Sequence, residues 1–150
     1  LFSDNFDIFL PDHHHIYVTT INIIKENYIF GIGPKMFRVY CEMSQYSVVG
    51  GCSTHPHNYY LQLLAETGLV GLCSVSLLFF YLLYKLLIIK FYKVNVNKAN
   101  KLIFFNIGSI ICLWPLVTSG SFFNNGVSII IYLNLGFSIN LISKVNKENV

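Results

Sequence analysis

Charged residues are scarce in this sequence of 150 residues. Asp, Glu, Lys and Arg together supply 11% of the chain, whereas about a quarter of the residues in a typical soluble domain are charged. Hydrophobic residues supply 54%, so the composition argues against a soluble globular protein. The sequence also has no basic stripe, and its formal net charge is only +3. We therefore expect no nucleic-acid partner.

The start of the sequence lacks two common features. It begins at Leu1 instead of methionine, and its opening residues contain neither the basic n-region nor the apolar h-region of a signal peptide. We therefore expect the chain to be the C-terminal part of a longer protein.

Long apolar runs, by contrast, are abundant after residue 68. A helix needs about 20 predominantly apolar residues to cross a bilayer, and three stretches approach that length. We predict spans at residues 69–89, 102–117 and 123–142, and Pro115 is expected to kink or tilt the second of them. The predicted fold is an all-α integral membrane protein in which residues 69–150 supply the transmembrane helices, a connecting loop and a tail.

Lysines flank these predicted spans on one side of the membrane. They surround the link between the first two spans and follow the third, at Lys85, Lys90, Lys93, Lys98, Lys101, Lys144 and Lys147. Cytoplasmic loops of membrane proteins carry an excess of Lys and Arg, so we place both clusters in the cytoplasm. Residues 1–68 then form a loop region on the outer side.

Two further helices are expected in this outer region. Apolar residues recur at helical spacing over residues 16–28, and the Gly-Ile-Gly-Pro run at residues 31–34 ends that helix. A second helix over residues 59–67 leads into the first span. There, a polar stripe with a spacing of four runs along one face, which fits either a solvated helix face or the wall of a polar cavity. It consists of Asn58, Gln62 and Glu66.

The loop before the second helix contains the residues best suited to chemistry. His57 could act as a general base, because imidazole titrates near neutral pH and can take a proton from a sugar hydroxyl. A loop histidine that makes ordinary hydrogen bonds is the alternative. Asn58 could orient a substrate hydroxyl or cap the following helix. Arg38 and Lys35 could contact a phosphate, since both keep their charge at neutral pH, or could lie solvated on the surface.

Cys41 and Cys52, in the same region, could bind zinc, form a disulfide or remain free thiols. With His55 and His57 they offer two thiols and two imidazoles, which zinc prefers, although ten residues between the cysteines are not a common zinc-finger spacing. An outer-face location would favour a disulfide instead, and two free thiols are equally allowed. The other two cysteines lie in predicted spans and are interpreted as small packing residues.

A longer pattern joins these residues. Gly31-Ile32-Gly33 is followed by His55-Pro56-His57-Asn58, and then by Ala-Glu-Thr-Gly-Leu-Val-Gly-Leu at residues 65–72. Trp114-Pro115 and a Ser-Gly-Ser-Phe-Phe-Asn turn at residues 119–124 come later. This order resembles the O-antigen ligase and polymerase family of bacterial envelope proteins over nearly the whole chain.

The resemblance implies a multi-spanning glycosyltransferase of the GT-C type in the bacterial inner membrane, with residues 1–68 in the periplasm. Such an enzyme moves a glycan from an undecaprenyl diphosphate carrier to an acceptor, without a metal, and we expect no cofactor. The acceptor is the lipid A core in a ligase and another repeat unit in a polymerase, in lipopolysaccharide or surface polysaccharide biosynthesis. His57 matches the family's catalytic histidine, which activates the acceptor hydroxyl.

We therefore predict that His57 is the catalytic base of an inverting transfer, the stereochemistry being that of the family. The predicted substrate-binding residues are Arg38, Lys35, His55, Asn58, Gln62 and Glu66. The sequence departs from the family at one point: His13-His14-His15 stands where the family usually has an arginine before the amphipathic helix. This departure places diphosphate binding on Arg38 or Lys35, or on residues that precede Leu1.

The rival interpretation is a non-catalytic multi-spanning membrane protein, such as a transporter piece or a degenerate remnant, whose outer loop only packs. Members of the family that the sequence resembles need many more membrane spans than three to form their substrate cavity. We therefore expect the 150-residue chain on its own to be inactive.

Overall fold

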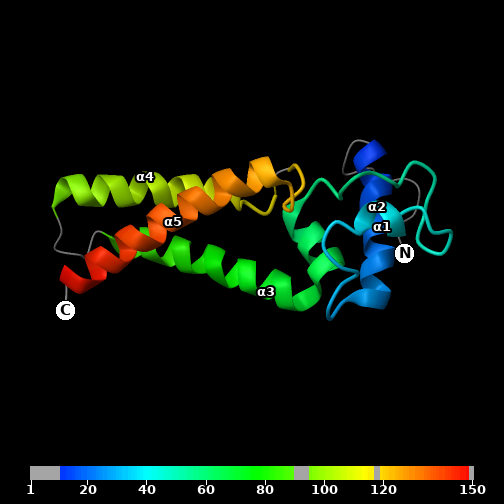
Figure 1. Ribbon diagram of the computed structural model, residues 1–150, viewed down its shortest axis with the longest axis horizontal. Coiled ribbons are helices and arrows are strands. Elements are labelled where there is room, and N and C mark those ends of the chain that lie inside the picture. The colour runs from blue at the N-terminus through cyan, green and yellow to red at the C-terminus, as the bar shows by residue number, and fades with distance from the viewer. Residues whose placement is uncertain (1–10, 90–94, 117–118, 149–150) are drawn as a thin grey trace. The chain divides into compact units, whose positions relative to one another are not determined.

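The computed structural model of the protein describes residues 11–89, 95–116 and 119–148 (Figure 1). Within these ranges there is no β-strand. The helices are α1 (Pro11–Asn27), α2 (Phe37–Tyr40), α3 (Tyr59–Ile88), α4 (Val96–Cys112) and α5 (Asn125–Glu148). The predicted all-α fold class is therefore confirmed.

The chain divides into two compact units, and the boundary falls inside α3. We call the first the loop unit; it comprises the chain up to Cys73 together with Pro115–Asn124. The second, the helical unit, comprises Ser74–Trp114 and the chain from Asn125 onward. The loop unit contains α1 and α2 in full, whereas α4 and α5 belong to the helical unit.

Helix α1 supplies the main apolar face of the loop unit. It begins at Pro11, earlier than the predicted start at residue 16, and proline suits a first helical turn because the N–H it lacks has no helical partner there. After α1 ends, the N–H of Gly31 donates to the Asn27 carbonyl at 2.8 Å. The core of the loop unit comprises Ile16, Ile23, Phe37, Cys41, Tyr46 and Ala65.

Helix α3 is interrupted at Gly68. This glycine has φ 66° and ψ −164°, so the helix before it and the helix after it are separate segments. A side chain at Gly68 would overlap the Ile29 carbonyl, and one at Gly31 would overlap the backbone of Glu66. Only glycine at these two positions lets the chain after α1 cross directly against the α3 backbone.

Hydrogen bonds at this crossing use the backbone groups that the break in α3 releases. The N–H of Ile32 donates to the Ala65 carbonyl at 3.0 Å, and the N–H of Gly33 donates to the Glu66 carbonyl at 2.9 Å. In the opposite direction, Leu69 N–H donates to the carbonyl of Tyr28 at 2.9 Å. The turn at residues 28–33 therefore satisfies both ends of the interrupted helix.

The helical unit packs α4 against α5. The rings of Phe105 and Phe137 stack with centroids 4.8 Å apart, and the hydroxyl oxygens of Ser109 and Ser138 lie 3.2 Å apart in a buried contact. Asn106, which is fully buried on α4, donates from its amide to the Leu82 carbonyl of α3 at 2.9 Å. Apolar stacking and a few short polar contacts thus join these helices.

Two helices are long and apolar enough to cross a membrane, Tyr59–Ile88 and Asn125–Lys147, among the residues described. They cover most of the first predicted span, residues 69–89, and most of the third, residues 123–142. The second predicted span, residues 102–117, coincides only in part with α4, which ends at Cys112 before Trp114 and Pro115. Its 17 residues make α4 shorter than the two candidates, so its crossing of the bilayer stays a prediction.

Candidate functional site

His57 lies in the loop that leads into α3 and is held at both its backbone and its ring. Its φ of 57° is in the left-handed region, which few non-glycine residues adopt and which often marks a functional position. The carbonyl of His57 accepts a hydrogen bond from the N–H of Ser119 at 2.8 Å. Its Nε2 atom lies 3.2 Å from the hydroxyl oxygen of Ser53. Two separate segments thus fix this one residue.

Three histidines converge at this point. The ring of His13, from the first turn of α1, meets the ring of His57 edge-on with centroids 5.2 Å apart, and the rings of His55 and His57 lie 4.3 Å apart. The Nδ1 atom of His13 and the Nε2 atom of His55 are buried with no hydrogen-bond partner. The sequence did not predict that His13 belongs to this cluster, because nothing in its spacing links it to His57.

The surroundings of His55 and His57 favour the neutral imidazole at both positions. Burial lowers the pKa of His57 below its ordinary value of 6.5, and the neighbouring His55 and His13 lower it further. Burial also lowers the pKa of His55, while the Ser119 backbone and Glu66 act in the opposite direction. His57 is therefore neutral at pH 7 and able to accept a proton.

The polar stripe predicted from the sequence is largely buried. Gln62 is 1% exposed and Glu66 is 0% exposed. The Gln62 amide donates to the Glu66 carboxylate at 3.0 Å and to the Ser121 hydroxyl at 3.0 Å, and its carbonyl oxygen accepts from the N–H of Phe122 at 2.8 Å. Glu66 also accepts from the N–H of Phe37 at 2.9 Å. These two side chains thus connect the start of α2 and the loop at residues 121–122 to α3.

Asn58 caps α3. Its side-chain oxygen accepts from the N–H of Tyr60 at 3.0 Å and from that of Leu61 at 3.1 Å, as an N-cap residue does. Its amide also donates to the Pro115 carbonyl at 2.8 Å. The capping role that the sequence offered for Asn58 is therefore confirmed. The sequence did not specify its bond to Pro115 or the contacts of Gln62 and Glu66, and the contact of all three side chains with substrate stays a prediction.

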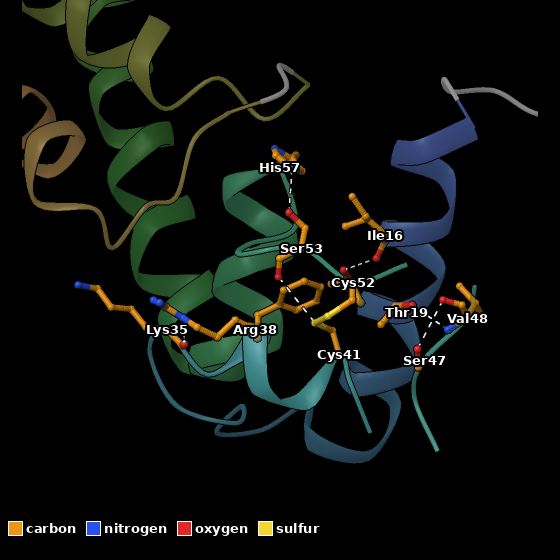
Figure 2. The surroundings of a disulfide bond; sticks show 12 residues. Ile16, Thr19, Lys35, Arg38, Cys41, Ser47, Val48, Cys52, Ser53 and His57 are labelled. Atoms are coloured by element: carbon orange, nitrogen blue, oxygen red, sulfur yellow. Dashed lines mark hydrogen bonds between the residues drawn. A yellow bond between two sulfur atoms is a disulfide. The ribbon is translucent and has the colours of Figure 1, made fainter. Parts of the chain in front are cut away.

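Lys35 and Arg38 are exposed neighbours before and inside α2. The Nε atom of Arg38 donates to the Lys35 carbonyl at 3.2 Å, and Lys35 has a positive φ of 64°. Figure 2 shows both side chains extending from the same side of their segment, apart from His57. The two cations form an exposed positive patch beside the loop unit's core, and their phosphate contact stays a prediction.

Cys41 and Cys52 form a disulfide, with Cα atoms 5.1 Å apart. Both thiols are therefore used, and the zinc alternative loses the two thiolates it required. Within the part of the chain that the structure describes, no group of three or more His, Cys, Asp or Glu residues is placed to hold a metal ion. Figure 2 shows Ser53 between this disulfide and His57.

A comparison with models of known protein families gives a match that covers this site. Neither a curated protein nor a solved structure matches the chain. Residues 13–76 match a family model described as O-antigen ligase, a segment that contains the disulfide, all three clustered histidines and the start of α3. This match confirms, over residues 13–76, the resemblance to the O-antigen ligase family that the sequence indicated.

Proposed function

We propose that the protein is a membrane glycosyltransferase that moves a glycan from an undecaprenyl diphosphate carrier to an acceptor hydroxyl at the periplasmic face. The family match supports an O-antigen ligase-like or polymerase-like function, and two apolar helices of membrane-spanning length support a membrane protein. The acceptor is the lipid A core if the protein is a ligase and a further repeat unit if it is a polymerase.

The observation that carries this proposal is the state of His57. A general base must be unprotonated at the working pH and must be held in place. Burial and the two neighbouring histidines lower the pKa of His57, and contacts from Ser53 and Ser119 fix its ring and backbone. It also lies inside the family-matched segment.

In the proposed reaction, His57 takes the proton of the acceptor hydroxyl as that oxygen attacks the anomeric carbon of the donor sugar. The new bond joins the acceptor oxygen to the anomeric carbon. The bond between that carbon and the diphosphate oxygen breaks, and its electron pair leaves with undecaprenyl diphosphate. Attack from the face opposite the diphosphate inverts the anomeric centre, as the family resemblance implies.

Lys35 and Arg38 are proposed to stabilise the negative charge that develops on the leaving diphosphate. Both are exposed and they lie beside one another through the Arg38 contact with the Lys35 carbonyl. Arg38 can bind two phosphate oxygens at once, and Lys35 supplies a compact positive charge. His55 and Asn58 are proposed to contact substrate near His57, and Gln62 and Glu66 further along α3.

The disulfide supports placement of the loop unit on the outer side of the membrane. Disulfides persist in the oxidising bacterial periplasm and are rare in the cytosol, and Cys41 is joined to Cys52 in this unit. The lysines that follow the apolar helices support the same orientation, because they suit the cytoplasmic side.

The decisive test is complementation of a ligase-deficient bacterial strain with the full-length protein, read as lipopolysaccharide ladders on a gel. His57→Ala should abolish the ladder that the wild-type protein restores, while an immunoblot shows equal amounts of both proteins in the membrane. His15→Ala is the matched control, because His15 is an exposed histidine of the same loop unit.

The pattern of results separates the alternatives. A ladder from His57→Ala would remove His57 from the catalytic role. If the wild-type protein restores no ladder in this strain, the same variants are tested in a strain that lacks the polymerase of its repeat unit. Failure in both strains, with both proteins in the membrane, would favour the non-catalytic alternative.

A further inference from the structure

The contacts of the His57 ring point to a residue that the sequence did not single out. Ser53 lies four residues before His57, and its hydroxyl oxygen is 3.2 Å from the Nε2 atom of His57. Ser53 is half-buried in a loop without regular secondary structure. A loop hydroxyl can orient a catalytic ring only if the loop itself is fixed in place. The contacts that fix Ser53 therefore decide whether it can orient the His57 ring.

The disulfide holds Ser53 from two directions. Cys52 is the residue immediately before Ser53 and is bonded to Cys41. The Sγ atom of Cys41 in turn lies 3.7 Å from the carbonyl oxygen of Ser53. Cys41 is fully buried in the core of the loop unit. Ser53 is therefore tied to the core through one covalent link and one close contact (Figure 2).

From this geometry we infer that Ser53, anchored by the Cys41–Cys52 disulfide, is a positioning residue that sets the tautomer and orientation of His57. This inference rests on the proposed role of His57 as general base. A neutral imidazole has one N–H and one lone pair. With Nε2–H donating to the Ser53 oxygen, the lone pair of Nδ1 is left to take the acceptor proton.

The same contact strengthens as the reaction proceeds. When His57 accepts the proton, its ring becomes a cation, and the Nε2–H···Oγ bond to Ser53 becomes charge-assisted. The other titratable groups that face His57 are His13 on α1 and His55 on the same loop. Neither of them supplies a negative charge, so the Ser53 oxygen is the acceptor that favours the protonated ring.

Ser53→Ala in the full-length protein tests this role. We expect kcat for glycan transfer to fall about tenfold, the size that one lost hydrogen bond predicts, with KM unchanged and with an altered pH dependence of kcat. Ser53→Thr keeps the hydroxyl and should retain most of the activity. Ser47→Ala is the matched control, because Ser47 is exposed and its hydroxyl contacts only the neighbouring Val48 carbonyl.

A spectroscopic measurement tests the inference independently of transfer. In protein labelled with ¹⁵N at histidine, the Nε2–H tautomer of His57 should dominate in the wild type and lose that dominance in Ser53→Ala. The His57 signal is identified by its absence in His57→Ala. Identical His57 signals in wild type and Ser53→Ala would overturn the inference, whether or not the proposed reaction is detected.

The anchoring role of the disulfide is tested with a Cys41→Ser, Cys52→Ser double variant. We expect it to shift the His57 signal and lower kcat in the same direction as Ser53→Ala, whereas Cys73→Ser, outside the disulfide, should change neither. Unchanged kcat and an unchanged His57 signal in the double variant would overturn the anchoring role. Wild-type kcat in Ser53→Ala together with loss of transfer in His57→Ala would overturn the Ser53 role alone and leave the proposed function intact.

Discussion

The loop unit and the helical unit satisfy their buried polar groups in different ways. In the loop unit, side chains of α3 bond to backbone groups far away in the sequence, as Glu66 does with Phe37 and Gln62 with Phe122. In the helical unit, most backbone groups are satisfied inside the helices, and few side chains such as Asn106 bond across them. The shape of the loop unit therefore depends on individual side chains, whereas that of the helical unit depends on apolar packing.

Paired glycine substitutions should show the largest contrast between the units. Gly68→Ala in the loop unit places a methyl group against the Ile29 carbonyl at a positive φ, and we expect a loss of about 3 kcal/mol or more in stability. Gly136→Ala on α5 meets no atom within 4 Å, and it should raise stability by roughly 0.5–1 kcal/mol, as helical alanine does.

Thermal unfolding of the two variants in the same detergent, followed by circular dichroism, measures this contrast. The midpoint should fall for Gly68→Ala and stay level or rise for Gly136→Ala. Equal shifts in the two variants would show that the crossing at Gly68 is no tighter than an open helix surface.

Glu66→Ala should have the next largest effect. It leaves the N–H of Phe37 and the Gln62 amide without their buried acceptor, at a cost of about 2–4 kcal/mol. Ser138→Ala in the helical unit removes only one contact with the Ser109 hydroxyl and should cost less than about 1 kcal/mol. Resistance to limited proteolysis measures both effects. If Ser138→Ala were as sensitive to protease as Glu66→Ala, the proposed difference between the two units would be wrong.

Asn58 allows its two contacts to be separated. Asn58→Ala loses the cap of α3 and the bond to the Pro115 carbonyl, with an expected cost of about 1–2 kcal/mol. Asn58→Asp keeps the capping oxygen and loses only the amide donor, so its stability should lie between those of Ala and wild type in urea unfolding. If Asp is as destabilising as Ala, the cap contributes little and the Pro115 contact carries the effect.

The smallest expected effect is the change of the transfer rate with pH. All five histidines, including His57, belong to the loop unit and none to the helical unit. Because burial lowers the pKa of His57 below 6.5, more than half of His57 is still neutral at pH 6.5. The transfer rate at that pH should therefore exceed half its plateau value and fall only at lower pH. A half-maximal rate above pH 6.5 would contradict this.

Elements that depend on sequence periodicity could be predicted, whereas contacts between distant segments could not. Apolar spacing predicted the helix at residues 16–28, and the structure has a longer α1 at Pro11–Asn27. A spacing of four correctly placed Gln62 and Glu66 on one helix face. It did not reveal their partners, because Ser121 lies in a loop and Phe37 begins the four-residue helix α2, and neither segment has a periodic signal.

The candidate site shows the same limit at the level of single residues. The sequence singles out His57 as the candidate base because it belongs to a continuous run that resembles the family, and this role stays a prediction. His13 and Ser119 approach it only through the folded chain, and no local pattern encodes such an approach. The adjacency of Ser53 to Cys52 was the one available signal for its role, and it becomes meaningful only once Cys41 and Cys52 are known to be bonded.

The crossing at Gly68 also bears on how the chain is synthesised. The ribosome makes residues 28–33 before residues 65–69, so the turn exists before the backbone groups that it will satisfy. Leu69, where the apolar helical segment resumes, receives its partner from the Tyr28 carbonyl, a group already present in the nascent chain. The acceptor for the Leu69 N–H is therefore synthesised before the helical segment that uses it. Deleting residues 28–33 would also remove the partners of the Ala65 and Glu66 carbonyls.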